Sequence, residues 1–93
     1  MTFEATKDPE SVIDFTINWA ATLAESSPSD EISTSAWTAD QAMVVDSDTN
    51  TTTTTTVWVS GGTRWKYANL VNTVVTTAGR TYERTITVKL QDK

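Results

Sequence analysis

Few side chains of this 93-residue sequence could take part in catalysis, because it contains neither cysteine nor histidine. This excludes disulfides, thiol nucleophiles, histidine-based triads and the usual zinc and haem ligand sets. Two carboxylate pairs remain, Asp8 with Glu10 and Asp30 with Glu31. Such pairs act as acid–base dyads only in an enclosed site that separates their pKa values. Both occur in polar, loop-like sequence, so we expect solvated surface charges, no enzyme and no cofactor.

The segment Asp46-Ser47-Asp48-Thr49-Asn50 has oxygen ligands on alternate residues, like the start of a calcium loop. The glycine and the closing glutamate of that motif are missing at their required positions. Turns rich in Asp and Asn have the same composition. We therefore expect a turn here and no metal.

Four aromatic residues in the second half could instead form a stacking platform for a sugar or a base: Trp58, Trp65, Tyr67 and Tyr82. A small sheet protein also needs aromatic side chains to fill its core, and this is the role we expect for most of them. Trp65 is the exception, because it lies between Arg64 and Lys66 directly after a glycine turn. Interfaces favour Trp and Arg anchors of this kind, so we expect Trp65 to face solvent or a partner.

The elements that position these residues are predicted to be strands. Apolar residues alternate with polar ones at Ile13, Phe15, Ile17 and Trp19, which is typical of a half-buried strand. A short helical or irregular segment follows, then a loop at Ser26–Asp30. Further strands are expected at Ile32–Thr38, Met43–Val45, Trp65–Thr77 and Arg80–Leu90. Within Ile32–Thr38, Ile32 and Trp37 have opposite parity, which requires a bulge or a strand that changes sheets.

Threonine makes up 20 of the 93 residues, and six of them are consecutive, from Thr51 to Thr56. Thr is β-branched and suits a pleated surface with one wet face. Because Val57-Trp58-Val59 continues the run, we expect one long strand closed by the Gly61-Gly62 turn. Two positions are open for it: a strand paired within the sheet, or an edge strand that a neighbouring subunit completes.

The spacing of these strands predicts an all-β fold, a small immunoglobulin-like antiparallel β-sandwich of about six to seven strands. A small barrel is the alternative. We expect an extended N-terminal arm at residues 1–11 and a single domain at residues 12–93. The absence of a signal peptide and of a long apolar run argues against a membrane association.

The net charge of −5 is unevenly distributed along the sequence. Residues 1–60 contain ten acidic residues against Lys7 alone, whereas residues 61–93 contain six basic residues against Glu83 and Asp92. The two halves could pair inside the fold, or an acidic face could meet the basic face of a neighbour. An acidic total argues against nucleic acid as a partner.

Several segments resemble, in order and spacing over almost the whole chain, small virion accessory proteins of tailed bacteriophages, some of them described as fiber–tail adaptors. The matching segments are Lys7–Phe15 with Asn18-Trp19, Ile32–Thr38, Val57–Thr63, Asn72–Thr81 and Glu83–Ile86. The Thr run and the triplet Arg64-Trp65-Lys66 depart from the pattern of these proteins.

The resemblance implies a non-enzymatic virion component, assembled in the host cytoplasm, that links tail and tail-fiber proteins and is present in several copies around a symmetric tail. A head decoration protein is the alternative, followed by a carbohydrate-binding module. The expected partner-contact residues are Lys7, Asp8, Glu10, Arg64, Trp65 and Lys66, together with the Thr51–Thr56 strand as an edge.

Overall fold

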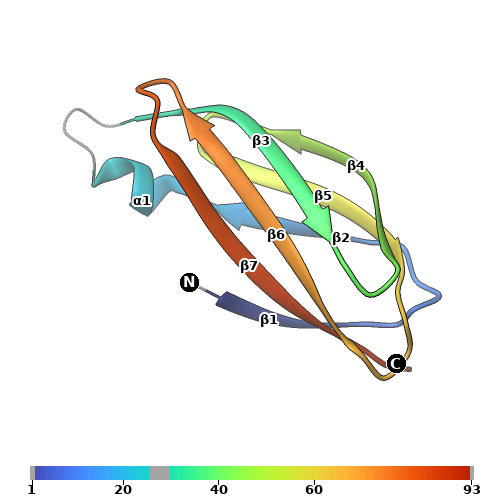
Figure 1. Cartoon of the computed structure of the whole chain (residues 1–93). Helices are drawn as coiled ribbons and strands as arrows, with labels where there is room; N and C mark the ends of the chain where they lie inside the picture. Colours follow the sequence, from blue (N-terminus) through green and yellow to red (C-terminus); the bar gives the residue numbers. More distant parts are fainter. Residues whose placement is uncertain (1, 26–29, 93) are drawn as a thin grey trace.

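The computed structural model describes residues 2–25 and 30–92, so residues 26–29 of the expected loop lie outside the described part. Within these residues one short helix, α1 (Ala20–Ala24), accompanies seven strands: β1 (Thr2–Lys7), β2 (Ile13–Asn18), β3 (Ile32–Ala39), β4 (Met43–Asn50), β5 (Thr54–Gly61), β6 (Tyr67–Thr76) and β7 (Thr81–Leu90). One sheet has the order β1-β7-β6-β3 and the other the order β2-β5-β4. The two sheets face each other (Figure 1). The predicted all-β sandwich is confirmed, and the pairing of β7, β6 and β3 in one sheet and β2, β5 and β4 in the other matches the immunoglobulin-like arrangement.

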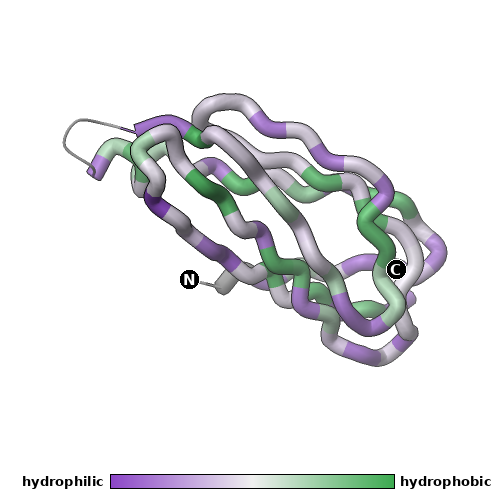
Figure 2. The backbone as a smooth tube through the Cα atoms, turned by 45° about the horizontal axis from the view of Figure 1, so that its top comes forward, coloured by the Kyte–Doolittle hydropathy of each residue, from purple (hydrophilic) through white to green (hydrophobic). Residues whose placement is uncertain are grey.

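Alternating side chains build the core, as the sequence predicts. Apolar and polar positions alternate along the strands (Figure 2), and the inward positions of β6 and of the second half of β7 are buried. Since successive strand residues point to opposite faces, the outward positions, many of them threonines, remain at the surface. The fully buried large apolar side chains come from both sheets and from α1: Trp19, Leu23, Val57, Val59, Leu70, Val74, Val88 and Leu90.

A buried polar cluster connects the two sheets inside this core. The Oδ1 atom of Asn72 on β6 accepts hydrogen bonds from Trp19 Nε1 at 3.0 Å and from Thr55 Oγ1 at 2.7 Å. Its amide nitrogen donates to Ser35 Oγ at 2.9 Å and to the carbonyl oxygen of Ala36 at 3.0 Å. A buried polar group is costly unless it is hydrogen-bonded, and here Asn72 uses both its donor and its acceptor atoms. The cluster therefore fixes β6 against β3, β5 and the end of β2.

The expected N-terminal arm is wrong for residues 2–7. They form β1, which pairs in parallel with β7 from Thr2 opposite Thr85 to Lys7 opposite Leu90. The physical reason is that inward and outward residues alternate over too few positions to predict a strand. Ala5 and Lys7 point inward, and Ala5 packs against the core. The segment before Val12 is thus part of the sandwich, and a turn at Asp8–Ser11 connects it to β2.

The Thr run was expected to be a single strand, but its first residues form a turn. β4 continues to Asn50, so the predicted turn at Asp46–Asn50 is also wrong, and the chain reverses at Thr51–Thr53 instead. The Oγ1 atom of Thr51 accepts hydrogen bonds from the backbone nitrogens of Thr53 and Thr54 at 3.3 and 3.0 Å, which stabilises this reversal. β5 then lies between β2 and β4. The alternative in which the Thr run forms an edge strand is therefore wrong.

The bulge predicted from the opposite parity of Ile32 and Trp37 is confirmed. The register of β3 against β6 shifts between Ile32 and Thr34, and this inserts one residue. Both Ile32 and Trp37 can consequently point into the core.

Candidate partner interface

The two segments expected to contact a partner, 54 residues apart in sequence, lie at one end of the sandwich (Figure 1). The β1–β2 and β5–β6 connections meet there, because Lys7 Nζ donates to the carbonyl oxygen of Gly61 at 2.8 Å. The β3–β4 connection joins them through a hydrogen bond of 2.8 Å from Thr63 N to Gln41 O. We call this surface, formed by Asp8, Glu10, Gln41, Ala42 and Arg64–Tyr67, the Trp65 end.

Lys7 lies beneath this surface and not on it. Its side chain is 0 % exposed, and its ammonium group donates to the carbonyl oxygens of Asp8, at 2.9 Å, and Gly61. Burial lowers the pKa of Lys7, while the carboxylates of Asp8 and Asp46 act in the opposite direction. A fully buried side chain cannot contact a partner of the folded protein. The expected contact role of Lys7 is thus replaced by a structural one, which is to hold two connections together.

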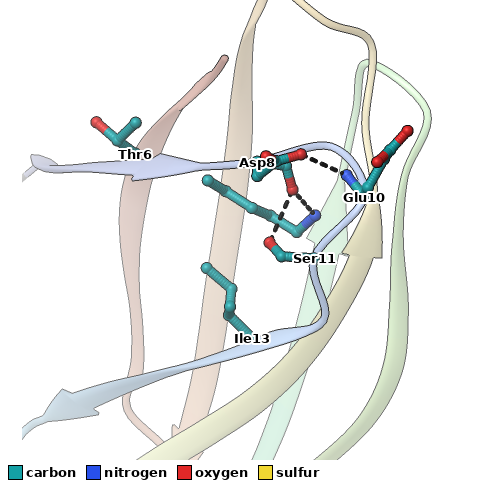
Figure 3. A pocket seen from close by; sticks show the side chains of 6 residues that line it. Thr6, Asp8, Glu10, Ser11 and Ile13 are labelled. Atoms are coloured by element: carbon teal, nitrogen blue, oxygen red, sulfur yellow. Dashed lines mark hydrogen bonds between the residues drawn. The ribbon is translucent and has the colours of Figure 1, made fainter. Parts of the chain in front are cut away.

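Asp8 organises the β1–β2 connection (Figure 3). Its side chain accepts a hydrogen bond from Glu10 N at 2.9 Å, and its carbonyl oxygen accepts from Ser11 N at 3.0 Å and Ser11 Oγ at 2.7 Å. This is an Asx turn, for which a short acceptor side chain is required. The turn leaves Glu10 exposed beside an open pocket of 480 Å³ that Thr6, Ser11 and Ile13 also line. Glu10 and the rim of this pocket are thus available to a partner.

Among the large apolar side chains whose burial the structure describes, that of Trp65 is the most exposed, with 67 % of its surface accessible. Its backbone is left-handed, with φ of 66°, a conformation that is unusual for a bulky residue. Three backbone hydrogen bonds maintain it: Trp65 N to Leu90 O at 2.6 Å, Lys66 N to Thr63 O at 3.2 Å, and Leu90 N to Lys66 O at 2.9 Å. The fold thus holds an unfavourable backbone conformation and presents a large apolar side chain to solvent.

Backbone strain is concentrated around Trp65. The non-glycine residues with positive φ in the described part of the chain are Trp65, Gln41 at 54° and Ala42 at 63°, and all three belong to the Trp65 end. Left-handed conformations of such residues persist only where the surrounding structure imposes them, and they cluster at functional sites. The sequence predicts no strand between Thr38 and Met43, but the residue types of Gln41 and Ala42 give no sign of their left-handed conformation.

Charged and aromatic side chains complete this surface. Arg64 Nε forms an exposed ion pair with Asp92 Oδ1 at 2.8 Å, while Lys66 is exposed. Tyr67, the first residue of β6, is 62 % exposed and follows Trp65 by two residues. Basic, acidic and aromatic groups thus lie close together, which is typical of a protein–protein contact surface.

The prediction that most aromatic residues fill the core is wrong for Trp58 and Tyr67. Trp58 is 45 % exposed, because it pairs with Asp14 and Ser47 on the outer face of the second sheet while its neighbours Val57 and Val59 point inward. Trp19 and Trp37 are buried. The exposure of Trp65 is as predicted.

The carboxylate pair Asp30 and Glu31 does not form a dyad or a solvated pair. Asp30 is buried at the other end of the sandwich, where its Oδ2 accepts from Arg80 Nη1 at 3.0 Å. This ion pair joins the acidic first half to the basic second half, one of the two arrangements that the charge distribution allows. Among residues 2–25 and 30–92, no group of three or more potential ligands is arranged to hold a metal ion. Nor does any helix there have the length and apolarity needed to span a membrane.

Comparison with known proteins places this architecture in a family. No curated protein matches the chain. The family model described as podophage GP4 fiber-tail adaptor protein gp77 matches residues 7–89. This range includes β2 to β6, nearly all of β7 and the three connections of the Trp65 end, but only the last residue of β1. The resemblance noted in the sequence is thereby confirmed, and the chain belongs to this family of podophage fiber-tail adaptor proteins.

Proposed function

We propose that this protein is a non-enzymatic adaptor of the phage virion, which joins tail and tail-fiber proteins through protein–protein contacts at the Trp65 end. The family description supports a role between fiber and tail. The observation that carries the proposal is Trp65 itself, since an exposed tryptophan on a strained backbone costs stability and contributes little to the core. The charged residues Asp8, Glu10, Arg64 and Lys66 lie at the same end of the sandwich.

Such a surface suits an interface with a central anchor and a polar rim. Buried Trp and Arg side chains provide most of the binding free energy in many interfaces, while rim charges set specificity and association rate. Several copies of the adaptor would repeat this contact around a symmetric tail. Assembly in the host cytoplasm, before the tail is complete, agrees with a chain that has no cysteine and needs no disulfide.

Virions produced with a Trp65→Ala protein test the proposal. Trp58→Ala is the matched control, because it removes a second exposed tryptophan on the outer face of β5. We expect both variants to fold, as judged by circular dichroism and thermal unfolding. We expect mass spectrometry of purified particles to detect the Trp58 variant and only a small fraction of the Trp65 variant.

Normal incorporation of Trp65→Ala would contradict the proposed contact surface. The location of the protein in the virion is tested separately by dissociating purified virions into heads and tails. An adaptor remains with the tails, whereas recovery with tailless heads in hundreds of copies would show a decoration protein instead.

A further inference from the structure

The two open sides of the sandwich are built differently. β3 and β4 border one side, and each carries a bulge, β3 between Ile32 and Thr34 and β4 between Val45 and Ser47. Bulges on edge strands hinder pairing with another chain. β2 borders the other side, pairs with β5 without any shift in register, and contains neither lysine nor proline. Its edge therefore has no bulge, lysine or proline, three features that hinder pairing with a further strand.

The backbone of β2 has hydrogen-bonding groups directed to this open side. Trp19 N donates to Thr53 O across the β2–β5 pair at 2.8 Å. Because antiparallel hydrogen bonds recur at every second residue, the odd-numbered residues of β2 direct their N–H and C=O groups to β5. The even-numbered Asp14 and Thr16 consequently direct theirs away from β5. A strand beside β2 would find these groups at the correct spacing.

A groove of 410 Å³ runs between β2 and the other sheet, next to that edge. Its apolar lining comes from Ala5, Phe15, Ile17 and Ile86, and Glu4 and Arg84 also border it. In the immunoglobulin-like arrangement the first strand pairs with the second. Here β1 pairs in parallel with β7 instead, so β2 is left as an edge strand of its sheet (Figure 1).

Charge indicates what this edge would accept. Asp14 on β2 and Glu4 on β1 are both exposed on this side of the molecule. An added strand with a basic residue at an outward position would lie next to Asp14 and form a cross-strand pair of opposite charge. Apolar residues at its alternate, inward positions would cover Phe15 and Ile17.

We propose that β2 is a β-augmentation site, which binds an extended, basic segment of a partner virion protein as an antiparallel strand over the groove. This rests on the adaptor function proposed above, since an adaptor must hold two partners by separate surfaces. The Trp65 end holds one partner and the β2 edge holds the other. Backbone pairing provides affinity at this second surface, and the groove selects alternating apolar side chains.

Binding of a synthetic peptide to the isolated full-length protein tests the site. The probe is a capped octapeptide that alternates valine with threonine and has one lysine at an outward position. We expect saturable binding, with the largest NMR shift changes at the amides of Asp14 and Thr16. The same peptide with a central proline should not bind.

Thr16→Pro is the decisive variant, because it removes an outward N–H without removing a backbone hydrogen bond to β5. The side-chain hydrogen bond between Thr16 Oγ1 and Thr56 Oγ1 on β5, at 3.0 Å, is lost equally in Thr16→Ala. We expect at least a roughly tenfold loss of affinity, the effect of one or more missing backbone hydrogen bonds. Thr16→Ala keeps the N–H and should bind like the wild type. Asp48→Pro places a proline at the opposite edge of the same sheet, where the N–H of Asp48 also points away from β5 by the same alternation, and should bind normally.

No saturable binding to the folded wild type, or equal binding by Thr16→Pro, would overturn this site. Shift changes centred on β3 or β4 would do the same. The peptide experiment needs no virion, so it is independent of the incorporation test with Trp65→Ala. A failed adaptor function with intact peptide binding, and the reverse, are therefore distinguishable.

Discussion

At the scale of single residues, the positions that depart from ordinary folding preferences are the informative ones. Trp65 combines a left-handed backbone with a mostly exposed apolar side chain. Lys7, in contrast, is a charged residue in a buried position, where it satisfies two carbonyl oxygens. Trp65 thus lowers the stability of the fold and adds an apolar group to the surface, whereas the ammonium group of Lys7 holds two connections together.

Replacing Trp65 by glycine and by alanine measures the backbone strain directly. Both variants lose the indole, but only glycine adopts positive φ without steric cost. We expect Trp65→Gly to be more stable than Trp65→Ala by about 1 kcal/mol, in spite of the greater flexibility of glycine in the unfolded chain. Urea unfolding of the two proteins provides the comparison. Equal stability, or a more stable alanine variant, would show that the backbone at Trp65 is not strained.

Asp30 gives the protein a predictable acid sensitivity. The hydroxyl of Thr76, followed by the Glu31 backbone and by Thr77 and Arg80, holds the pKa of the Asp30 carboxyl well below its usual range, although burial acts to raise it. Because the folded-state pKa is lower than the unfolded value of about 3.9, this stabilisation is fully present above that pH. It is lost as the pH falls from there toward the folded-state pKa.

The Asp30→Asn variant tests this pH dependence. It should be less stable than the wild type at pH 7, and the difference should shrink as the pH is lowered below about 4. Thermal unfolding between pH 2 and pH 7 under matched salt conditions provides the measurement, with Asp14→Asn as the exposed control. A constant difference over the whole range would mean that ionisation of Asp30 does not stabilise the fold.

At the scale of elements, the connections and not the strands carry the unusual features. Gly62, in the β5–β6 connection, has φ of 116°, and a Cβ atom there would lie 2.6 Å from Leu90 Cδ2. Gly79, in the β6–β7 turn, also has positive φ, at 87°, but an added Cβ would meet no atom within 4 Å. A substitution at Gly79 therefore introduces backbone strain alone, whereas one at Gly62 introduces backbone strain and steric overlap with Leu90.

Alanine at each glycine tests how tightly the β5–β6 connection is packed. Gly79→Ala should cost about 1 kcal/mol through its backbone alone. Gly62→Ala should cost roughly 1–3 kcal/mol more, because Leu90 belongs to the core and must shift. Chemical denaturation of both variants measures the loss of unfolding free energy. An equal loss in the two variants would show that the Leu90 side chain can shift without cost.

The strands could be predicted from the sequence because their alternation is local. The faces of β2 and β7 and the bulge in β3 all follow from the parity of apolar residues. The position of β1 could not be predicted in this way, because its pairing with β7 joins residues about 83 positions apart in the sequence. Nor does the Thr run indicate where its turn lies. Thr51 and Thr54 have the same side chain, but Thr51 lies in the turn and Thr54 begins β5.

The candidate interface was predictable in part. The position of Trp65 between two basic residues and after a glycine turn indicated an exposed side chain. That Asp8 and Glu10 lie at the same end follows only from the tertiary fold. The core role expected for Trp58 failed because Val57-Trp58-Val59 is apolar at every position, so that parity alone does not show which face is inward.

At the scale of the whole molecule, the proposed surfaces are arranged as an adaptor requires. The sandwich is elongated, measuring 45 × 22 × 17 Å. The Trp65 end lies at one pole, and the β2 edge runs along one side. Two partners can thus be held without competing for the same residues, and one hydrophobic core connects the two surfaces.

Footprinting of tryptophan side chains in intact virions tests the proposed contact most directly. Isolated protein and purified particles are oxidised with the same dose of hydroxyl radicals, and the modification of each tryptophan is measured by mass spectrometry. Trp65 should react readily in the isolated protein, where it is 67 % exposed, and should become strongly protected in the virion. Equal oxidation of Trp65 in both samples would contradict its role as the anchor of the adaptor.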